Sequence, residues 1–267
     1  MERDTALVHL SGGVGNVVLA TPLLVALDAL GFTVDVLLDA DYCETAELLR
    51  GWAVVRRVFT RGARELRWRE YERLVPAVPP FYWRRFSRLY ARERRAVARP
   101  RDRLFYEDEQ DYYLSFARAL GSPAEFRPVY RLPVEPSDEF GVSARTLVVA
   151  PGSKGGEMRA KRWGGFARLA EAFDDVAVVG TRDDLLAPDG KAIRFPKHAR
   201  LFVDRLTLGE TARLLASAGA VVASDCGLAH VAAAAGTPTV MIFGPTPHLA
   251  LGRLAPNVTV LRAGLPC

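Results

Sequence analysis

The 267-residue sequence has few cysteines, few lysines and no long apolar run. Its three cysteines, Cys43, Cys226 and Cys267, are an odd number without metal-ligand spacing, which argues against a disulfide framework or a zinc site. No apolar stretch reaches the roughly 18 residues that span a bilayer. The first residues lack the basic and then apolar pattern of a secretory signal, so we expect a cytoplasmic protein.

The composition that remains is that of a folded globular protein. Hydrophobic residues make up 49% of the chain and charged residues 25%. The length fits one large domain or two of ordinary size, each with enough residues for a core.

The net charge of +5 is unevenly distributed. Sixteen arginines and only five acidic residues lie in the stretch from Arg56 to Arg103, with tryptophans and tyrosines between them. Because the whole chain has only four lysines, the stretch is compatible with an ordinary solvated surface rich in arginine. It is also compatible with peripheral contact at the inner face of a membrane or with an anionic acceptor. No nucleic-acid-binding motif accompanies the charge, so we expect no nucleic acid partner.

The first fifty residues have the pattern of a strand–helix–strand unit, the start of a doubly wound sheet. A glycine-rich turn, residues 11–16, follows the first apolar run, and Gly31 ends the helical pattern. The predicted elements are strands at 6–10 and 33–38 and helices at 17–30 and 42–49.

A second α/β unit begins near Thr146, after a proline-rich connector. We therefore expect an α/β protein with an N-terminal domain of residues 1–133 and a C-terminal domain of residues 140–267, and a ligand cleft between them. The predicted strands are 146–150, 176–180, 220–223 and 239–243, and the predicted helices are 64–71, 83–98, 111–120, 164–173, 208–217 and 228–235.

The turn after the strand at 220–223 has the chemistry of a diphosphate site. The strand brings Asp225 to the carboxyl end of the sheet, where open α/β folds bind ligands. Cys226 and Gly227 open the next helix, so their N–H groups face an anion, and Gly227 permits close approach. The same residues are also compatible with an ordinary strand–helix turn capped by Asp225, with His230 in the core.

Four strings of the sequence, in order, are LSGGVGNVVLATPLL at 10–24, APGS at 150–153 with KRW at 161–163, VASDCGLAH at 222–230, and GTPTVMIFGPT at 236–246. Together they resemble glycosyltransferase family 9, the ADP-heptose:lipopolysaccharide heptosyltransferases and their relatives. The resemblance implies a GT-B-type fold, in which two Rossmann-like doubly wound domains face each other across a cleft. It implies that the protein transfers a heptose or similar sugar, with inversion, from an ADP-linked nucleotide-diphosphate donor to a hydroxyl of a glycan or glycolipid. It also implies that the reaction needs neither a metal nor a cofactor.

The resemblance also assigns donor-binding roles. Lys161 matches the lysine that the family places against the donor phosphate and sugar, and Asp225 is assigned to the sugar hydroxyls. His230 would donate to a phosphate oxygen or support the loop. The remaining donor-binding candidates are Ser153, Gly180, Thr181, Leu206, Cys226 and Gly227, with Lys154 as a second cation. Cys226 replaces the family's usual threonine.

The glycine-rich loop is the expected acceptor side, with Gly12, Gly13 and Gly15 as acceptor-binding candidates. Family members typically have an aspartate after this loop as the general base, and this chain has Asn16. An amide cannot take a proton at neutral pH.

Three interpretations of Asn16 are open. It orients the acceptor while another carboxylate acts as base, the acceptor is acidic enough to need no base, or the protein is a catalytically silent binder of the donor. The nearest candidate carboxylates are Asp39, Asp41, Asp108 and Glu109.

Overall fold

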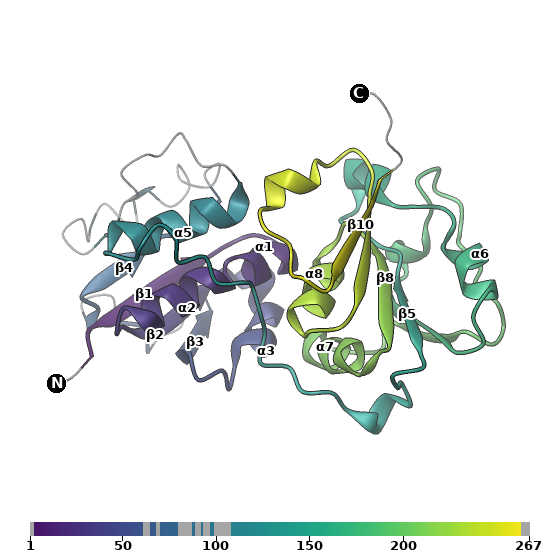
Figure 1. Cartoon of the computed structure of the whole chain (residues 1–267), viewed down its shortest axis with the longest axis horizontal. Helices are drawn as coiled ribbons and strands as arrows, with labels where there is room; N and C mark the ends of the chain where they lie inside the picture. Colours follow the sequence, from purple (N-terminus) through teal and green to yellow (C-terminus); the bar gives the residue numbers. More distant parts are fainter. Residues whose placement is uncertain are drawn as a thin grey trace. The chain divides into compact units, whose positions relative to one another are not determined.

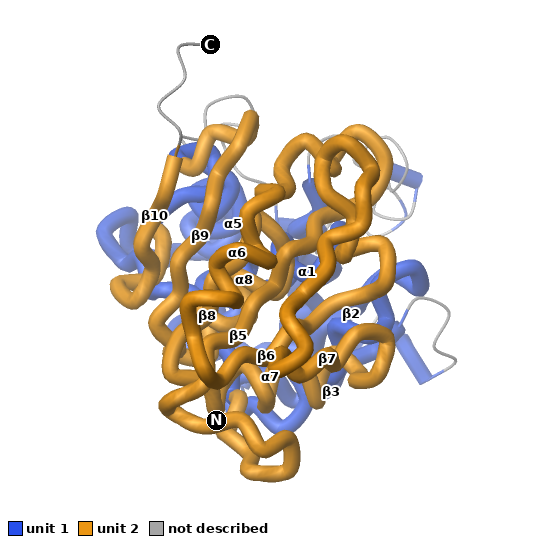
Figure 2. The backbone as a smooth tube through the Cα atoms, turned by 90° about the vertical axis from the view of Figure 1, so that its right-hand side faces the viewer, with its two compact units in different colours: residues 1–133, 249–253 blue, residues 134–248, 254–267 orange. Residues whose placement is uncertain are grey.

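The computed structural model describes residues 3–60, 65–67, 70–79, 87–88, 92, 97–98 and 108–262. The chain divides into two compact units (Figure 2). Unit 1 comprises residues 1–133 and 249–253, and unit 2 comprises residues 134–248 and 254–267. Each unit is built on its own parallel sheet (Figure 1).

Unit 1 contains a four-stranded sheet in the order β3-β2-β1-β4. Its strands are β1 (Thr5–Leu10), β2 (Thr33–Leu38), β3 (Val55–Thr60) and β4 (Arg73–Val75), and its helices are α1 (Val14–Leu19), α2 (Thr21–Ala29), the 3-10 helix η1 (Ala40–Thr45), α3 (Ala46–Leu49) and α5 (Glu109–Ala119). The two central strands, β1 and β2, are buried along nearly their whole length, as their continuous apolar runs predict.

Two helix predictions in unit 1 are wrong in their bounds. The predicted helix at 17–30 is two helices, because the chain turns at Ala20 and Pro22 lies in the first turn of α2, where its missing N–H costs no hydrogen bond. The predicted helix at 42–49 is a 3-10 turn followed by α3, with non-helical angles at Tyr42. The predicted helix at 64–71 is wrong where the structure describes it, because residues 65–67 and 70–71 are not α-helical. Most of the predicted helix at 83–98 lies outside the described residues.

The start of the arginine-rich stretch has a structural role. Arg56 and Arg57 on β3 both bind the fully buried carboxylate of Asp35 on β2, with Nη2–Oδ2 distances of 2.7 and 2.8 Å, and Tyr71 donates to the same oxygen at 2.7 Å. Burial alone would raise the pKa of Asp35, but these hydrogen bonds lower it below its ordinary value. About half of the stretch from Arg56 to Arg103 lies outside the described residues.

Unit 2 contains a six-stranded sheet in the order β10-β9-β8-β5-β6-β7. Its strands are β5 (Leu147–Ala150), β6 (Val176–Gly180), β7 (Arg200–Val203), β8 (Ala220–Ser224), β9 (Thr239–Phe243) and β10 (Val258–Arg262). Its α-helices are α6 (Phe166–Glu171), α7 (Leu208–Ser217) and α8 (Gly227–Ala234). Its 3-10 helices are η4 (Asp138–Phe140), η5 (Gly156–Lys161), η6 (Asp183–Leu185) and η7 (His248–Leu251), and residues 249–253 belong to unit 1. The predicted helix at 164–173 is shorter than expected.

The strand order of unit 2 reverses direction at β5. The chain passes from β5 outward to β6 and β7, and then returns to the other side of β5 to form β8, β9 and β10. This is the order of a dinucleotide-binding α/β sheet, with its switch point between β5 and β8. Helix α8 packs on β8 and β9 and contacts α7 (Figure 1). Open sheets of this kind bind ligands outside the carboxyl ends of the strands at the switch point.

None of the described helices is long and apolar enough to cross a membrane.

Candidate functional site

The loops after β5 and β8 are joined at the switch point of unit 2. Ser224, at the end of β8, is fully buried and donates its hydroxyl hydrogen to the carbonyl oxygen of Pro151, directly after β5, at 3.0 Å. The N–H of Asp225 donates to Ile242 on the neighbouring strand β9 at 3.1 Å. The turn that follows β8 is therefore held in place on two sides.

This turn leads directly into α8. Cys226 is the N-cap residue, with extended backbone angles of φ −150° and ψ 168°, and Gly227 is the first helical residue. The first N–H groups of a helix have no partner within it, and together with the helix dipole they favour an anion. The first turn of α8 contains no acidic residue that would offset this charge.

Lys161 and Asp225 form an ion pair at the end of this turn. Lys161, the last residue of η5, donates from Nζ to Oδ2 of Asp225 at 2.7 Å. The Asp225 side chain is only 5% exposed, whereas that of Lys161 is 22% exposed. The sequence places the two residues 64 positions apart, and the fold brings them together. The pair presents one cation and one carboxylate beside the positive end of α8.

His230 lies on the other side of Asp225, with its Nε2 4.0 Å from Oδ1. The pKa of His230 is lowered to about 4, chiefly by burial; the negative charge of Asp225 opposes this shift and the positive charge of Lys161 adds to it. His230 is therefore a neutral imidazole at neutral pH, able to donate one hydrogen bond but not to carry charge.

The buried His230 predicts a pH dependence of stability. Between about pH 6.5 and 4 the unfolded chain binds a proton at this residue and the folded chain does not, so the free energy of unfolding falls as the pH falls through this window. We expect His230→Gln to remove this part of the slope in urea unfolding measured across the same pH range. His198→Gln, at an exposed histidine, should keep the wild-type slope. Equal slopes for wild type and His230→Gln would rule out a buried neutral His230.

Cys226 has no nucleophilic character in this setting. Burial raises the pKa of the Cys226 thiol to about 12, so the thiolate is not populated at neutral pH. The contribution of Cys226 that the geometry retains is its backbone N–H at the helix start.

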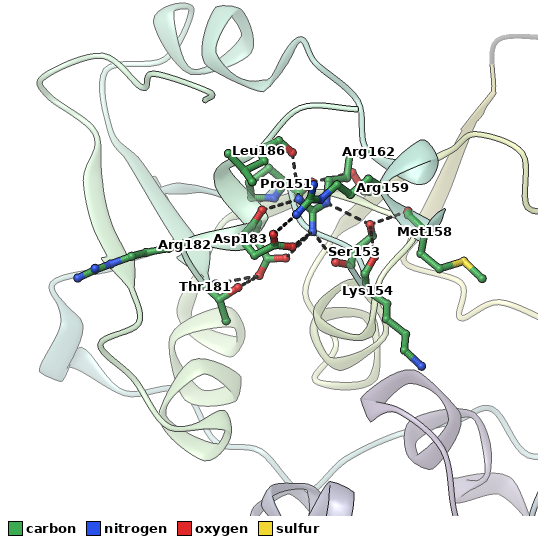
Figure 3. A network of polar contacts seen from close by, with 12 residues as sticks. Pro151, Ser153, Lys154, Met158, Arg159, Arg162, Thr181, Arg182, Asp183 and Leu186 are labelled. Carbon is green, nitrogen blue, oxygen red and sulfur yellow. Dashed lines mark hydrogen bonds and ion pairs between the residues drawn. The ribbon is translucent and has the colours of Figure 1, made fainter. Parts of the chain in front are cut away.

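The loop after β5 is organised by Arg162, which sequence reasoning did not single out (Figure 3). The Arg162 side chain is fully buried and donates to the carbonyl oxygens of Ser153 at 2.7 Å, Leu186 at 3.0 Å and Asp183, and to the Asp183 carboxylate at 2.7 Å. Ser153 is 8% exposed, and its hydroxyl donates to Met158 at 2.8 Å and accepts from Arg162 at 3.2 Å. The Ser153 hydroxyl is thus used within the protein, while Lys154 is exposed and its side chain points away from the network (Figure 3).

The candidates for nucleoside binding lie at the carboxyl ends of β6 and β7. Gly180 ends β6 with a φ of 131°, a conformation that favours glycine. Thr181 donates from its N–H and its hydroxyl to Asp184 at 2.8 and 2.9 Å. Leu206 is half-buried after β7 and precedes Thr207, which caps α7. These residues therefore lie at the same edge of the sheet as Asp225.

The glycine-rich loop of unit 1 follows β1 and closes around Asn16. Gly12 has a φ of 112°, and a Cβ at this position would lie 2.9 Å from the Asn16 side chain. Gly13 caps α1 and donates its N–H to Asn16 Oδ1 at 3.0 Å, and Gly15 is in the first turn of the helix. The Asn16 amide donates to Oε1 of Glu109, the first residue of α5. The loop conformation thus depends on Asn16.

The four candidate carboxylates near Asn16 have different environments. Asp39 is 3% exposed and binds His9 Nε2 at 3.2 Å and the Ser11 hydroxyl at 2.6 Å. Asp41 is exposed on η1, and Asp108 caps α5 by accepting from the N–H of Asp111 at 2.7 Å. Of these four, Glu109 accepts a hydrogen bond from the Asn16 amide.

The described residues contain no group of three or more histidine, cysteine, aspartate or glutamate side chains that could hold a metal ion. The expectation of a metal-independent reaction stays a prediction.

Comparisons with known proteins identify the family of the chain and its fold. Residues 116–267 match the family described as glycosyltransferase family 9 (heptosyltransferase). The lipooligosaccharide heptosyltransferase 2 of Haemophilus influenzae is 36% identical over 124 residues, which are 42% of this chain and 35% of that protein. The matched stretch therefore spans about a third of this curated relative.

Two solved structures share the fold. The E. coli ADP-heptose LPS heptosyltransferase II superposes with a TM-score of 0.72 at 22% identity, covering 96% of this chain and 90% of that chain. A family 9 glycosyltransferase from Veillonella parvula superposes with a TM-score of 0.74 at 16% identity, covering 98% and 88%. The predicted α/β fold of the GT-B type is therefore confirmed, with two parallel Rossmann-like sheets.

Proposed function

Because the chain belongs to glycosyltransferase family 9, the heptosyltransferase family, we propose that it transfers a heptose or similar sugar, with inversion, from a nucleotide-diphosphate donor to a hydroxyl of a glycan or glycolipid. The observation that carries this proposal is the Lys161–Asp225 ion pair beside the start of α8 at the switch point of the unit 2 sheet.

Each part of this site has a role in the proposed reaction. The diphosphate accepts hydrogen bonds from the N–H groups of Cys226 and Gly227, where the helix dipole favours negative charge. Asp225 accepts hydrogen bonds from hydroxyls of the donor sugar. Its negative carboxylate would repel the diphosphate, so its hydrogen-bond partners are the neutral sugar hydroxyls. Lys161 stabilises the charge that grows on the diphosphate as the bond to the sugar breaks. Neutral His230 donates to a phosphate oxygen or supports Asp225.

The remaining donor candidates serve the nucleoside and the loop. Gly180, Thr181 and Leu206 line the carboxyl ends of β6 and β7, where the ribose and base of a nucleotide bind in sheets of this order. Ser153 acts through its place in the Arg162 network, which fixes the loop after β5. Gly12, Gly13, Gly15 and Asn16 are proposed to face the acceptor.

An ADP-linked heptose is the proposed donor, because the solved relative from E. coli is titled an ADP-heptose LPS heptosyltransferase and the Haemophilus relative a lipooligosaccharide heptosyltransferase. We propose a glycolipid acceptor for the same reason. Contact of the stretch Arg56–Arg103 with a membrane surface stays a prediction, although Arg56 and Arg57 are already bound to Asp35.

A thermal-shift panel of sugar nucleotides tests donor binding. We expect ADP-heptose to raise the melting temperature most, because a ligand that binds only the folded state stabilises it by RT ln(1 + [L]/Kd), about 2.7 kcal/mol at a hundredfold excess over Kd. UDP- and GDP-linked sugars serve as matched controls.

Transfer is then measured as ADP release with heptose-deficient lipooligosaccharide as acceptor, with and without EDTA. Release that persists in EDTA supports a metal-independent reaction. Binding without any release would favour a catalytically silent homologue, and no shift with any nucleotide would contradict the donor site itself.

A further inference from the structure

A carboxylate lies directly beside Asn16 in the folded protein. Glu109 is 93 residues away in sequence, yet its Oε1 accepts a hydrogen bond from the Asn16 amide. The phenol of Tyr113, one turn further along α5, donates to the same oxygen at 3.0 Å. The side chain of Glu109 is thus held at the glycine-rich loop by two donors.

The orientation of Asn16 is set by the loop. Its Oδ1 accepts from the N–H of Gly13 at 3.0 Å, so its NH₂ group is the part that faces Glu109. An asparagine held in this way cannot take a proton, but it can fix a carboxylate that does.

Tyr113 is suited to the same task. Burial, and then the negative charge of Glu109, raises the pKa of Tyr113 well above its ordinary value. The phenol therefore stays protonated and keeps donating to Glu109. Other titratable groups among the described residues at this end of α5 are Asp108, which caps the helix, Asp111, which binds Arg118 and Arg127, and Tyr112, whose ring contacts Tyr113.

Glu109 differs from the second carboxylate at this edge of the sheet. Asp39 is 3% exposed and binds His9 and Ser11, whereas Glu109 is partly exposed at the loop, like Asn16. A general base must reach the proton that it takes, and a carboxylate that is almost fully buried, like that of Asp39, is poorly placed for that.

Resting on the proposed transfer function, we infer that Glu109 is the general base that deprotonates the acceptor hydroxyl, with Asn16 and Tyr113 as positioning residues. The acceptor oxygen forms a bond to the anomeric carbon, and the bond from that carbon to the diphosphate oxygen breaks. The electron pair of the broken bond leaves with the nucleoside diphosphate. The hydroxyl proton passes to the Glu109 carboxylate and from there to water.

The first test is the isosteric variant Glu109→Gln, assayed with ADP-heptose as donor and with heptose-deficient lipooligosaccharide or water as acceptor. We expect kcat to fall about 10²-fold, within the range of a lost general base, while the affinity for ADP-heptose and the melting temperature stay at wild-type values. The acid limb of the pH–rate profile should disappear with the carboxylate. Glu125→Gln, at an exposed glutamate of the same unit, is the control and should leave rate and profile unchanged.

The second test moves the carboxylate across the hydrogen bond. In the double variant Asn16→Asp with Glu109→Gln, an amide on α5 faces a carboxylate on the loop, so the hydrogen bond is kept in reverse. We expect kcat of this double variant to be at least tenfold higher than kcat of Glu109→Gln, because a carboxylate is again present, one side chain away from its original position. The single variant Asn16→Asp places two carboxylates together, which should move the acid limb to higher pH.

The outcomes of these tests distinguish a wrong assignment of Glu109 from a wrong assignment of the transfer function. A Glu109→Gln variant with kcat within about threefold of wild type would overturn the assignment of Glu109 and leave the transfer function standing. If the rate falls but the swap does not recover it and the acid limb persists, Glu109 has only a structural role. Wild-type protein that binds ADP-heptose without releasing ADP to either acceptor would overturn the transfer function, and the base with it.

Discussion

Replacing Lys161 by alanine is expected to lower kcat/KM for sugar transfer about 10³-fold, the loss typical of removing a charge that stabilises a transition state. The Lys161 ammonium binds Asp225 at 2.7 Å at the start of α8 and is the partly exposed member of the pair. As the bond to the sugar breaks, negative charge grows on the diphosphate at this position. We expect Asp225→Ala to have a comparable effect, because it removes the proposed contact with the sugar hydroxyls.

Lys154→Ala is the matched control for Lys161→Ala. Lys154 is an exposed lysine seven positions earlier whose side chain points away from the Arg162 network (Figure 3). We expect its loss to change kcat/KM less than about twofold, since an exposed charge is screened by solvent. Steady-state ADP release, with circular dichroism to check folding, measures all three variants. Folded Lys161→Ala and Asp225→Ala with wild-type rates would remove the site assignment.

Replacing Arg162 by methionine is expected to destabilise unit 2 by about 4 kcal/mol and to lower its melting temperature by about 10 °C. The guanidinium is fully buried and donates to the backbone carbonyl oxygens of Ser153, Asp183 and Leu186. Methionine fills similar space but leaves these acceptors without their donor. The loops after β5 and β6 would lose their shared anchor (Figure 3).

Two control variants distinguish the effect of burying the guanidinium from the effect of its charge on stability. Arg159→Met removes a partly exposed arginine that binds the same carboxylate of Asp183 at 2.5 Å, and we expect a small change in melting temperature. Arg162→Lys keeps the charge but not the planar set of five donors, so its effect should lie between wild type and Arg162→Met. Urea unfolding followed by tryptophan fluorescence measures the series. Equal losses for Arg159→Met and Arg162→Met would contradict the special role of the buried guanidinium.

The central strands could be predicted from sequence, and the edge strands could not. The runs at 33–38, 176–180 and 239–243 are β2, β6 and β9 with the same bounds, because strands covered on both faces are continuously apolar. The edge strands β3 and β10 were not predicted. β3 carries Arg56 and Arg57, and three of the five residues of β10 are exposed, so neither strand has the continuous apolar run of a strand buried on both faces.

Part of the candidate site could also be predicted from the sequence, and part could not. Sequence strings located Lys161 and Asp225, and the structure shows them as an ion pair. The sequence does not indicate the role of Arg162, next to Lys161, because arginine is rarely fully buried. Its position is explained by the backbone carbonyl oxygens that accept hydrogen bonds from it in the fold. Glu109 was one of four carboxylates with equal standing in the sequence, since a contact across 93 residues has no local pattern.

A crystal structure of the full chain with ADP bound tests the central claim most directly. We expect the diphosphate at the switch point of unit 2, with its oxygens within hydrogen-bond distance of the N–H groups of Cys226 and Gly227 and of Lys161 Nζ. The adenosine should lie along Gly180, Thr181 and Leu206. A diphosphate bound away from the start of α8, with the Lys161–Asp225 pair untouched, would contradict this claim.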